Sequence, residues 1–227
     1  TSILTLGNFP SLLTQRLISL LFIALSLAML YWYLRYNNFT RLQSSSFSLI
    51  LLPFIGTNMD IVSRPDSLGL FLYLSSILII PLANKRKWIV AVSALLTTLA
   101  FLAKAYFLLS FAIVLVYLVL NQKWLLKYYF PSFILIFGSI LVFSVYYFPT
   151  YFDSFFMVQF KSTSLSEMHM LRQLEHFTSI NFLIVPIFIY LLFSLAPRHT
   201  DYLMNIEFIA LIVSFAAFIY TGRHAGN

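Results

Sequence analysis

Long apolar runs separated by short polar segments make up most of this chain. A helix that crosses a bilayer needs about 20 mainly apolar residues, and fewer where it is tilted or partly buried. The pattern predicts an all-α, polytopic transmembrane helix bundle of about eight spans, and the shortness of several spans favours a bundle with an internal site. The predicted spans are Leu17–Leu34, Phe47–Ile55, Leu68–Leu82, Trp88–Leu102, Tyr106–Leu120, Phe130–Phe148, Phe182–Leu195 and Met204–Tyr220.

The composition agrees with a membrane protein and excludes other classes. The 227 residues are 61% hydrophobic, 19% aromatic and 9% charged, and a water-soluble domain of this size cannot bury so much apolar surface. The net charge of +7 is typical of nucleic-acid binders, but the cations stand in short clusters between apolar runs, where they fit orientation signals. We therefore expect membrane lipids, and no nucleic acid, as partners. The absence of cysteine excludes disulfides and thiolate chemistry.

Basic residues fall mainly on one side of the predicted membrane. Alternation of the spans places the basic loops on one face, which we take as cytoplasmic. The outer face receives Asp60, Arg64, Asp66 and Lys104, although the positive-inside tendency predicts few cations there. Cations on that side favour an anionic partner such as a lipid-linked phosphate. The cytoplasmic cations are Arg35, Arg41, Lys85, Arg86, Lys87, Lys123, Lys127 and Arg198.

The stretch 150–181 is the one long segment between predicted spans. Ser164 and Glu167 have the spacing of a capping box, and apolar residues follow at helical intervals. This predicts an outer-face loop with an amphipathic interfacial helix, within a single transmembrane domain over 1–227. Because the chain starts at Thr1 and ends just after an apolar run, we expect an internal, incomplete piece of a longer protein.

Arg64-Pro65-Asp66 opens a predicted span. Proline at a first helical position and aspartate near a helix N-terminus are both favoured, so a capped helix start with an interfacial arginine explains the motif without any function. The functional alternative is that Asp66, with Asp60, holds a divalent cation (Mg or Mn) or an acceptor group, while Arg64 meets a phosphate oxygen.

Lys104 lies between two apolar runs, with no other charge from Trp88 to Leu120. A lysine near a helix end can extend toward the interface, but a turn with only Lys-Ala at its apex is tight for an exposed loop. The pattern therefore favours an ammonium held as a point charge for a phosphate.

The segment after the last predicted span offers a second set of anion ligands. Arg223 and His224 can bind an anion, and the flanking glycines allow close backbone approach. A frayed end with an interfacial arginine explains this segment nearly as well.

The order of these motifs resembles the membrane-embedded glycosyltransferases of the GT-C superfamily, and more narrowly the protein mannosyltransferase and aminoarabinose transferase branch. Members show an RPD-like motif at the outer end of a span and an AFLTK-like motif at the end of a later one. Here these are Arg64-Pro65-Asp66 and Ala100-Phe101-Leu102-Ala103-Lys104, and Gly222–Asn227 is similar to the start of a Gly-rich segment that runs into Asn-Tyr.

The resemblance implies an enzyme of the bacterial inner membrane with its site on the outer face. It takes a sugar from a polyprenyl-phosphate donor and passes it to a lipid, glycan or protein acceptor. Arg64 and Lys104 would contact the carrier phosphate, helped by Arg223 and His224, while Asp66 is the catalytic candidate on the metal or acceptor side. Asp60 and Asn227 are secondary candidates.

One departure from the family leaves two other functions open. The family's main catalytic acid follows the first span, but Thr1–Gln15 contains no acidic residue, so we expect that loop to lie upstream. The same basic cluster suits a transporter or flippase for an anionic lipid or sugar phosphate, although paired half-repeats are not evident. A non-catalytic subunit of a membrane complex also fits the missing acid.

Overall fold

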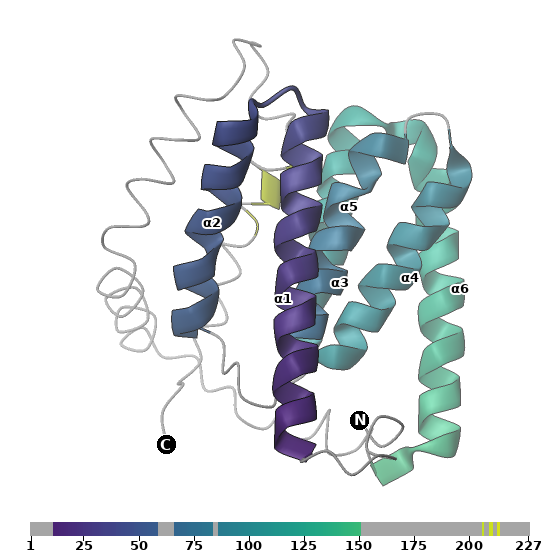
Figure 1. Ribbon diagram of the computed structural model, residues 1–227. Coiled ribbons are helices and arrows are strands. Elements are labelled where there is room, and N and C mark those ends of the chain that lie inside the picture. The colour runs from purple at the N-terminus through teal and green to yellow at the C-terminus, as the bar shows by residue number, and fades with distance from the viewer. Residues whose placement is uncertain are drawn as a thin grey trace, which may run out of the picture. The chain divides into compact units, whose positions relative to one another are not determined.

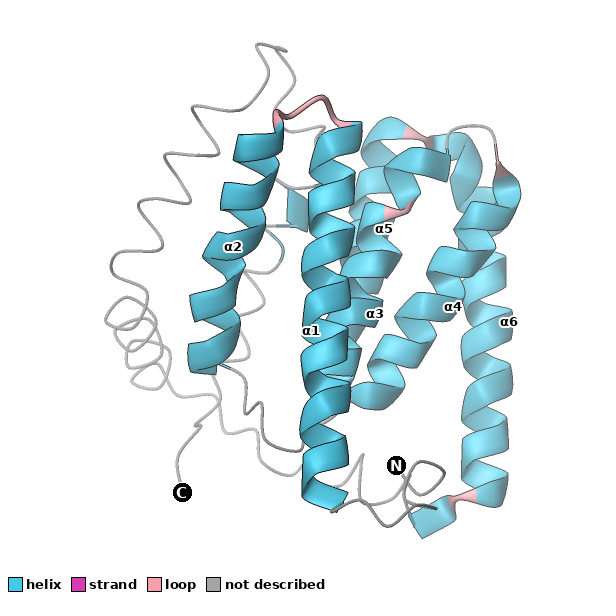
Figure 2. Ribbon diagram, viewed as in Figure 1, coloured by secondary structure: helices cyan, strands magenta, loops and turns pink. Residues whose placement is uncertain are grey.

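The structure is a computed structural model that describes residues 11–58, 66–83 and 86–150, with residues 206, 209, 210 and 213. Every regular element in these ranges is a helix, so the all-α prediction is confirmed for them (Figure 2). The helices are α1 (Ser11–Tyr36), α2 (Arg41–Asn58), α3 (Asp66–Leu78), η2 (Ile80–Ala83), α4 (Lys87–Ala103), η3 (Ala105–Leu108), α5 (Leu109–Asn121) and α6 (Lys123–Tyr147).

The chain divides into two compact units, Thr1–Phe111 (unit 1) and Ala112–Asn227 (unit 2). In unit 1, α1 packs against α2 on one side and α3 on the other, and α3 also packs against α4 (Figure 1). Helices α1 and α2 form an antiparallel hairpin with a short connection, and α3 and α4 are also antiparallel, with η2 in the segment between them (Figure 1). The prediction of one transmembrane domain over 1–227 stays a prediction.

Local chemistry fixes the turn between α1 and α2. Asn38 has a positive φ of 65°, and the amides of Asn38 and Phe39 donate to the carbonyls of Arg35 and Leu34, which is the Schellman pattern that ends many helices. The Arg35 guanidinium also donates to the Phe39 carbonyl at 2.6 Å. The next helix then starts two residues later, which holds α2 antiparallel to α1.

A reciprocal cap starts α2. The Thr40 amide donates to Gln43 Oε1 at 3.0 Å, and the Gln43 amide donates to Thr40 Oγ1 at 3.3 Å. These bonds satisfy two amides that have no partner inside the helix. The predicted second span, Phe47–Ile55, is therefore part of a longer helix that begins at Arg41.

Helix lengths correct the expected number of spans. In the described ranges, two helices are long and apolar enough to cross a membrane, Thr14–Tyr36 within α1 and Lys123–Tyr147. Helices α3, α4 and α5 are apolar but have 13, 17 and 13 residues, and at 1.5 Å per residue they fall short of a hydrocarbon core of about 30 Å. Six of the eight predicted spans fall in this part of the chain, so the expected number of spans is too high for it. The runs Phe182–Leu195 and most of Met204–Tyr220 lie outside the described residues.

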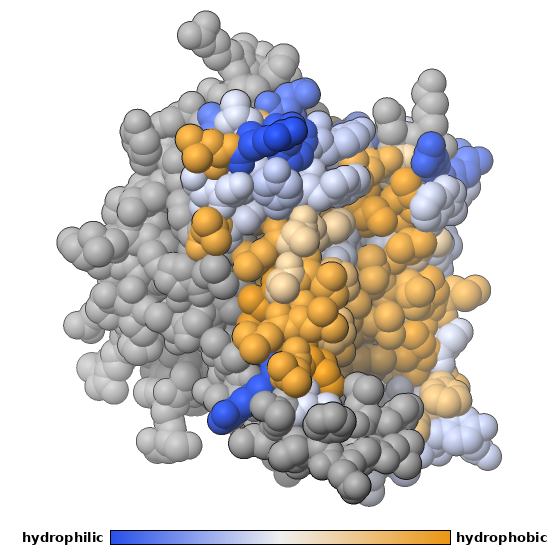
Figure 3. All heavy atoms as spheres, in the orientation of Figure 1, coloured by the Kyte–Doolittle hydropathy of each residue, from blue (hydrophilic) through white to orange (hydrophobic). Residues whose placement is uncertain are grey.

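Buried hydroxyl residues accompany the apolar residues of the core, and many other large apolar side chains face outward. Ser26, Ser93 and Thr97 are almost fully buried, whereas Leu17 and Leu135 are 58% and 71% exposed. Figure 3 shows an apolar surface along the middle of α1, with hydrophilic residues at the two ends and most of them at the end that carries the turn to α2. Buried hydroxyls with an apolar exterior are typical of helices that pack against one another in lipid.

Candidate functional site

Asp66 and Lys104, two of the residues singled out from the sequence, meet in unit 1. Lys104 Nζ lies 2.5 Å from Asp66 Oδ1, an ion pair between residues far apart in the sequence. The Asp66 side chain is 8% exposed and that of Lys104 is 27% exposed. The structure therefore brings the predicted anion ligand and the predicted catalytic candidate together.

The ends of two antiparallel helices create this meeting. Asp66 is the first residue of α3, where the helix dipole favours a carboxylate. Helix α4 ends at Ala103, and Lys104 takes an extended conformation (φ −158°, ψ 139°) with its amide bonded to the Ala100 carbonyl at 3.1 Å. Because α3 and α4 run antiparallel and in contact, the start of one and the end of the other coincide.

The position of the pair agrees with the predicted sidedness. Arg35 and Arg41 flank the α1–α2 turn, and Lys87 starts α4 at the same end of unit 1 (Figure 1). Lys104 follows the last residue of α4 and so lies at the opposite end. The basic loops and the ion pair are therefore on opposite ends of unit 1, as expected if the pair faces the outer side.

Burial makes the two charges depend on each other. A carboxylate removed from water is stabilised mainly by a close opposite charge and by hydrogen bonds. Lys104 keeps about a quarter of its side-chain surface exposed, whereas Asp66 keeps less than a tenth. The lysine is therefore the more accessible member of the pair.

The other predicted site residues fall outside the described residues. They are Arg64, Asp60, Arg223, His224 and Asn227. The stretch 150–181, predicted as an outer-face loop with an interfacial helix, also lies outside them apart from Thr150.

The described residues do not fit a divalent cation. Mg²⁺ and Ca²⁺ need several oxygen ligands, whereas Asp66 is the only acidic residue in the described ranges and its carboxylate faces an ammonium. No group of three or more metal-ligating side chains occurs in that part of the chain. We therefore assign no step to Mg or Mn here.

Two residues that matter for this geometry were not predicted from the sequence. Gly69, one turn after Asp66, lies directly under the ring of Phe107, which follows Lys104 on η3. A glycine inside an apolar helix was the available signal, since such a glycine often marks a close approach of another segment.

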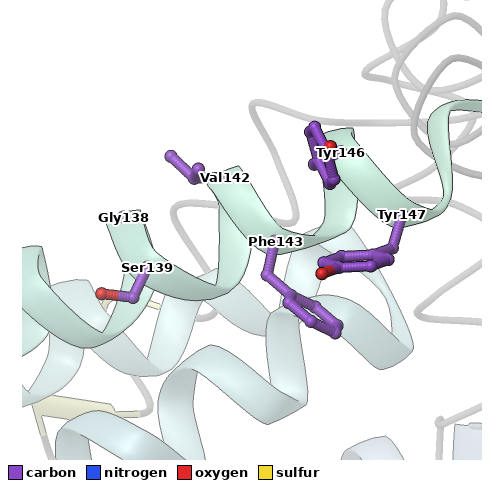
Figure 4. Close-up of a pocket in the computed structure, with 6 residues that line it drawn as sticks. All are labelled: Gly138, Ser139, Val142, Phe143, Tyr146 and Tyr147. Carbon is purple, nitrogen blue, oxygen red and sulfur yellow. The ribbon is translucent and has the colours of Figure 1, made fainter.

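Unit 2 contains an open groove on the second half of α6. Its volume is about 630 Å³, and Gly138, Ser139, Val142, Phe143, Tyr146 and Tyr147 line it (Figure 4). Phe143 and Tyr147 lie against each other with ring centroids 4.5 Å apart. The described lining residues carry no charge, so they offer apolar contact and tyrosine hydroxyls.

In comparisons with known proteins, no family model, no curated protein and no solved structure matches the chain.

Proposed function

We propose that this chain is part of a multi-pass membrane glycosyltransferase of the GT-C type. It would move a sugar from a polyprenyl-phosphate donor to a lipid, glycan or protein acceptor at the outer face of the bacterial inner membrane. The single observation that carries this proposal is the ion pair between Asp66 and Lys104. The two motifs on which the resemblance rests end in these two residues, and a shared site requires that they meet.

The distribution of side chains supports membrane embedding. Only 28% of the apolar window in α1 and 11% of that in α6 is buried, so neither behaves as the core helix of a water-soluble domain. Trp124 and Lys127 lie near the start of α6, and Tyr146 and Tyr147 lie at its end. Aromatic and basic residues at helix ends are typical of the two membrane interfaces. The shorter helices α3 and α4 would then form a bundle interior that ends at the ion pair.

In this proposal Lys104 binds a phosphate oxygen of the donor. The ammonium would exchange the Asp66 carboxylate for the phosphate and stabilise the negative charge that develops as the sugar–phosphate bond breaks. The released carboxylate of Asp66 would take the proton of the acceptor hydroxyl as the hydroxyl oxygen bonds to the sugar, and the electron pair of the broken sugar–phosphate bond would leave on the phosphate oxygen. The products are the glycosylated acceptor and polyprenyl monophosphate.

A transfer assay tests this function. The protein would be purified and supplied with polyprenyl-phosphate sugars extracted from bacterial membranes, and polyprenyl monophosphate would be quantified by mass spectrometry. We expect release with the wild type and a loss of about 10- to 100-fold in Lys104→Met, the effect of one charge-assisted contact. Lys123→Met, at the start of α6, serves as the matched control.

Lys104→Arg tests in the same assay whether the positive charge at position 104 is sufficient for activity or whether the shape of the lysine side chain is also needed. It keeps the positive charge, so it should retain more activity than Lys104→Met. Full activity of Lys104→Met would mean that the ion pair is structural only, and the proposed role would be wrong.

A further inference from the structure

Gly69 on α3 leaves room for the Phe107 ring, and Phe107 in turn helps to hold Lys104 at Asp66. A Cβ built on Gly69 would lie 2.6 Å from Phe107 Cδ2, closer still to Phe107 Cε2, and 3.1 Å from the Ala103 Cβ. Real Cβ atoms do not approach so closely, so the Phe107 ring occupies space that exists only because residue 69 has no side chain. Gly69 is three residues after Asp66 and therefore on the same face of α3.

Phe107 is anchored from several directions. Its side chain is buried, with 4% of the residue exposed, and its ring centroid is 5.7 Å from that of Tyr73, one turn further along α3. Its carbonyl accepts a hydrogen bond from Ser110 Oγ at 2.9 Å. The ring, the main chain and the next helix thus fix the position of this residue.

A backbone hydrogen bond links Phe107 to Lys104. The Phe107 amide donates to the Lys104 carbonyl at 3.0 Å, and the Lys104 amide donates to the Ala100 carbonyl. Lys104 is therefore held between the last turn of α4 and the seated Phe107. Displacement of the Phe107 ring would move η3 and, with it, the residue that carries the ammonium.

We propose that Gly69 is a positioning residue, which seats Phe107 on α3 and thereby places the Lys104 ammonium at the Asp66 carboxylate for recognition of the donor phosphate. This rests on the proposed function for the identity of the ligand. The seating itself is a geometric claim that can be tested without any ligand.

The chain has no cysteine, so an engineered cysteine pair reports proximity without background. Asp66→Cys/Lys104→Cys would be treated in membranes with a short thiol-to-thiol cross-linker, with and without Gly69→Ala. We expect cross-linking in the Gly69 background and its loss when Gly69→Ala is added. The matched control is Gly138→Ala, because a Cβ there meets nothing within 4 Å, and it should leave cross-linking intact.

A second pair of variants separates loss of seating from loss of folding. If the Gly69→Ala methyl acts through the Phe107 ring, its effect on the thermal midpoint should largely disappear in a Phe107→Ala background. Additive effects of the two substitutions would contradict the contact.

Binding then separates the two proposals. Gly69→Ala should weaken binding of polyprenyl monophosphate in nanodiscs, whereas Gly138→Ala should not. If cross-linking persists in Gly69→Ala, the positioning role is wrong whatever the wild type binds. If Gly69→Ala loses cross-linking but the wild type does not bind polyprenyl monophosphate, Gly69 does position Phe107 and Lys104, and the proposed function is wrong.

Discussion

At the scale of single residues, Asp66 is the most constrained charge in the described chain. Its carboxylate is nearly buried and lies against Lys104, so removal of the ammonium leaves an uncompensated buried charge. We expect Lys104→Met to lower the free energy of unfolding by on the order of 3 kcal/mol, and Asp66→Asn/Lys104→Met to recover most of this loss. Thermal unfolding in detergent, followed by circular dichroism, measures both. A double variant that is less stable than Lys104→Met alone would contradict the pair.

Asn38 offers a second test at this scale. Its φ of 65° is in the left-handed region, which β-branched residues avoid and glycine adopts freely. Asn38→Val should therefore destabilise the α1–α2 turn by about 1–2 kcal/mol, while Asn38→Gly should change stability little. The same unfolding measurement compares the two variants. Equal stabilities for them would contradict the turn geometry.

Among the helices, the apolar runs predicted where a helix lies more accurately than where it begins and ends. The run Trp88–Leu102 corresponds closely to α4, whereas the run Phe130–Phe148 matches the end of α6 and misses its first seven residues. The run Phe47–Ile55 missed the first turns of α2, which are polar. The spacing of Thr40 and Gln43 was the signal for that start, since it matches a capping box.

The capping box gives the prediction at this scale. Thr40→Ala removes the hydroxyl that accepts from the Gln43 amide, and it should cost about 1 kcal/mol of stability. Thr40→Ser keeps the hydroxyl and is the matched control. A thermal midpoint of Thr40→Ala equal to that of Thr40→Ser would show that the cap contributes nothing.

In the whole molecule, the sequence singled out Lys104 and Asp66 separately but predicted neither their pairing nor the contacts that hold them. Lys104 and Asp66 stood out because charge is rare in apolar segments and needs a partner. Gly69 and Phe107 did not, because the close approach of a ring to a position without Cβ depends on how α3 and η3 meet in three dimensions. The number of spans was also overestimated, since apolar runs of 13–17 residues satisfy composition without reaching the length of a full crossing.

The orientation of the helices in the membrane can be tested directly. With no native cysteine, single cysteines at exposed positions can be labelled by a membrane-impermeant maleimide on intact cells. We expect Thr150→Cys, just after α6, to be labelled directly, and Arg41→Cys, at the start of α2, only after the membrane is opened. The reverse pattern would place the ion pair on the cytoplasmic side and contradict the proposed outer-face site.

The proposed phosphate site can be tested by the affinity of the protein for polyprenyl monophosphate in nanodiscs, with and without the cation at position 104. Asp66→Asn/Lys104→Met is the key variant, because it should fold without an unpaired buried charge and still lack the phosphate ligand. We predict saturable binding by the wild type, binding about 10- to 100-fold weaker in this double variant, and unchanged binding in Lys127→Met. Equal affinities for the wild type and the double variant would show that Lys104 does not bind the phosphate, and the proposed site would be wrong.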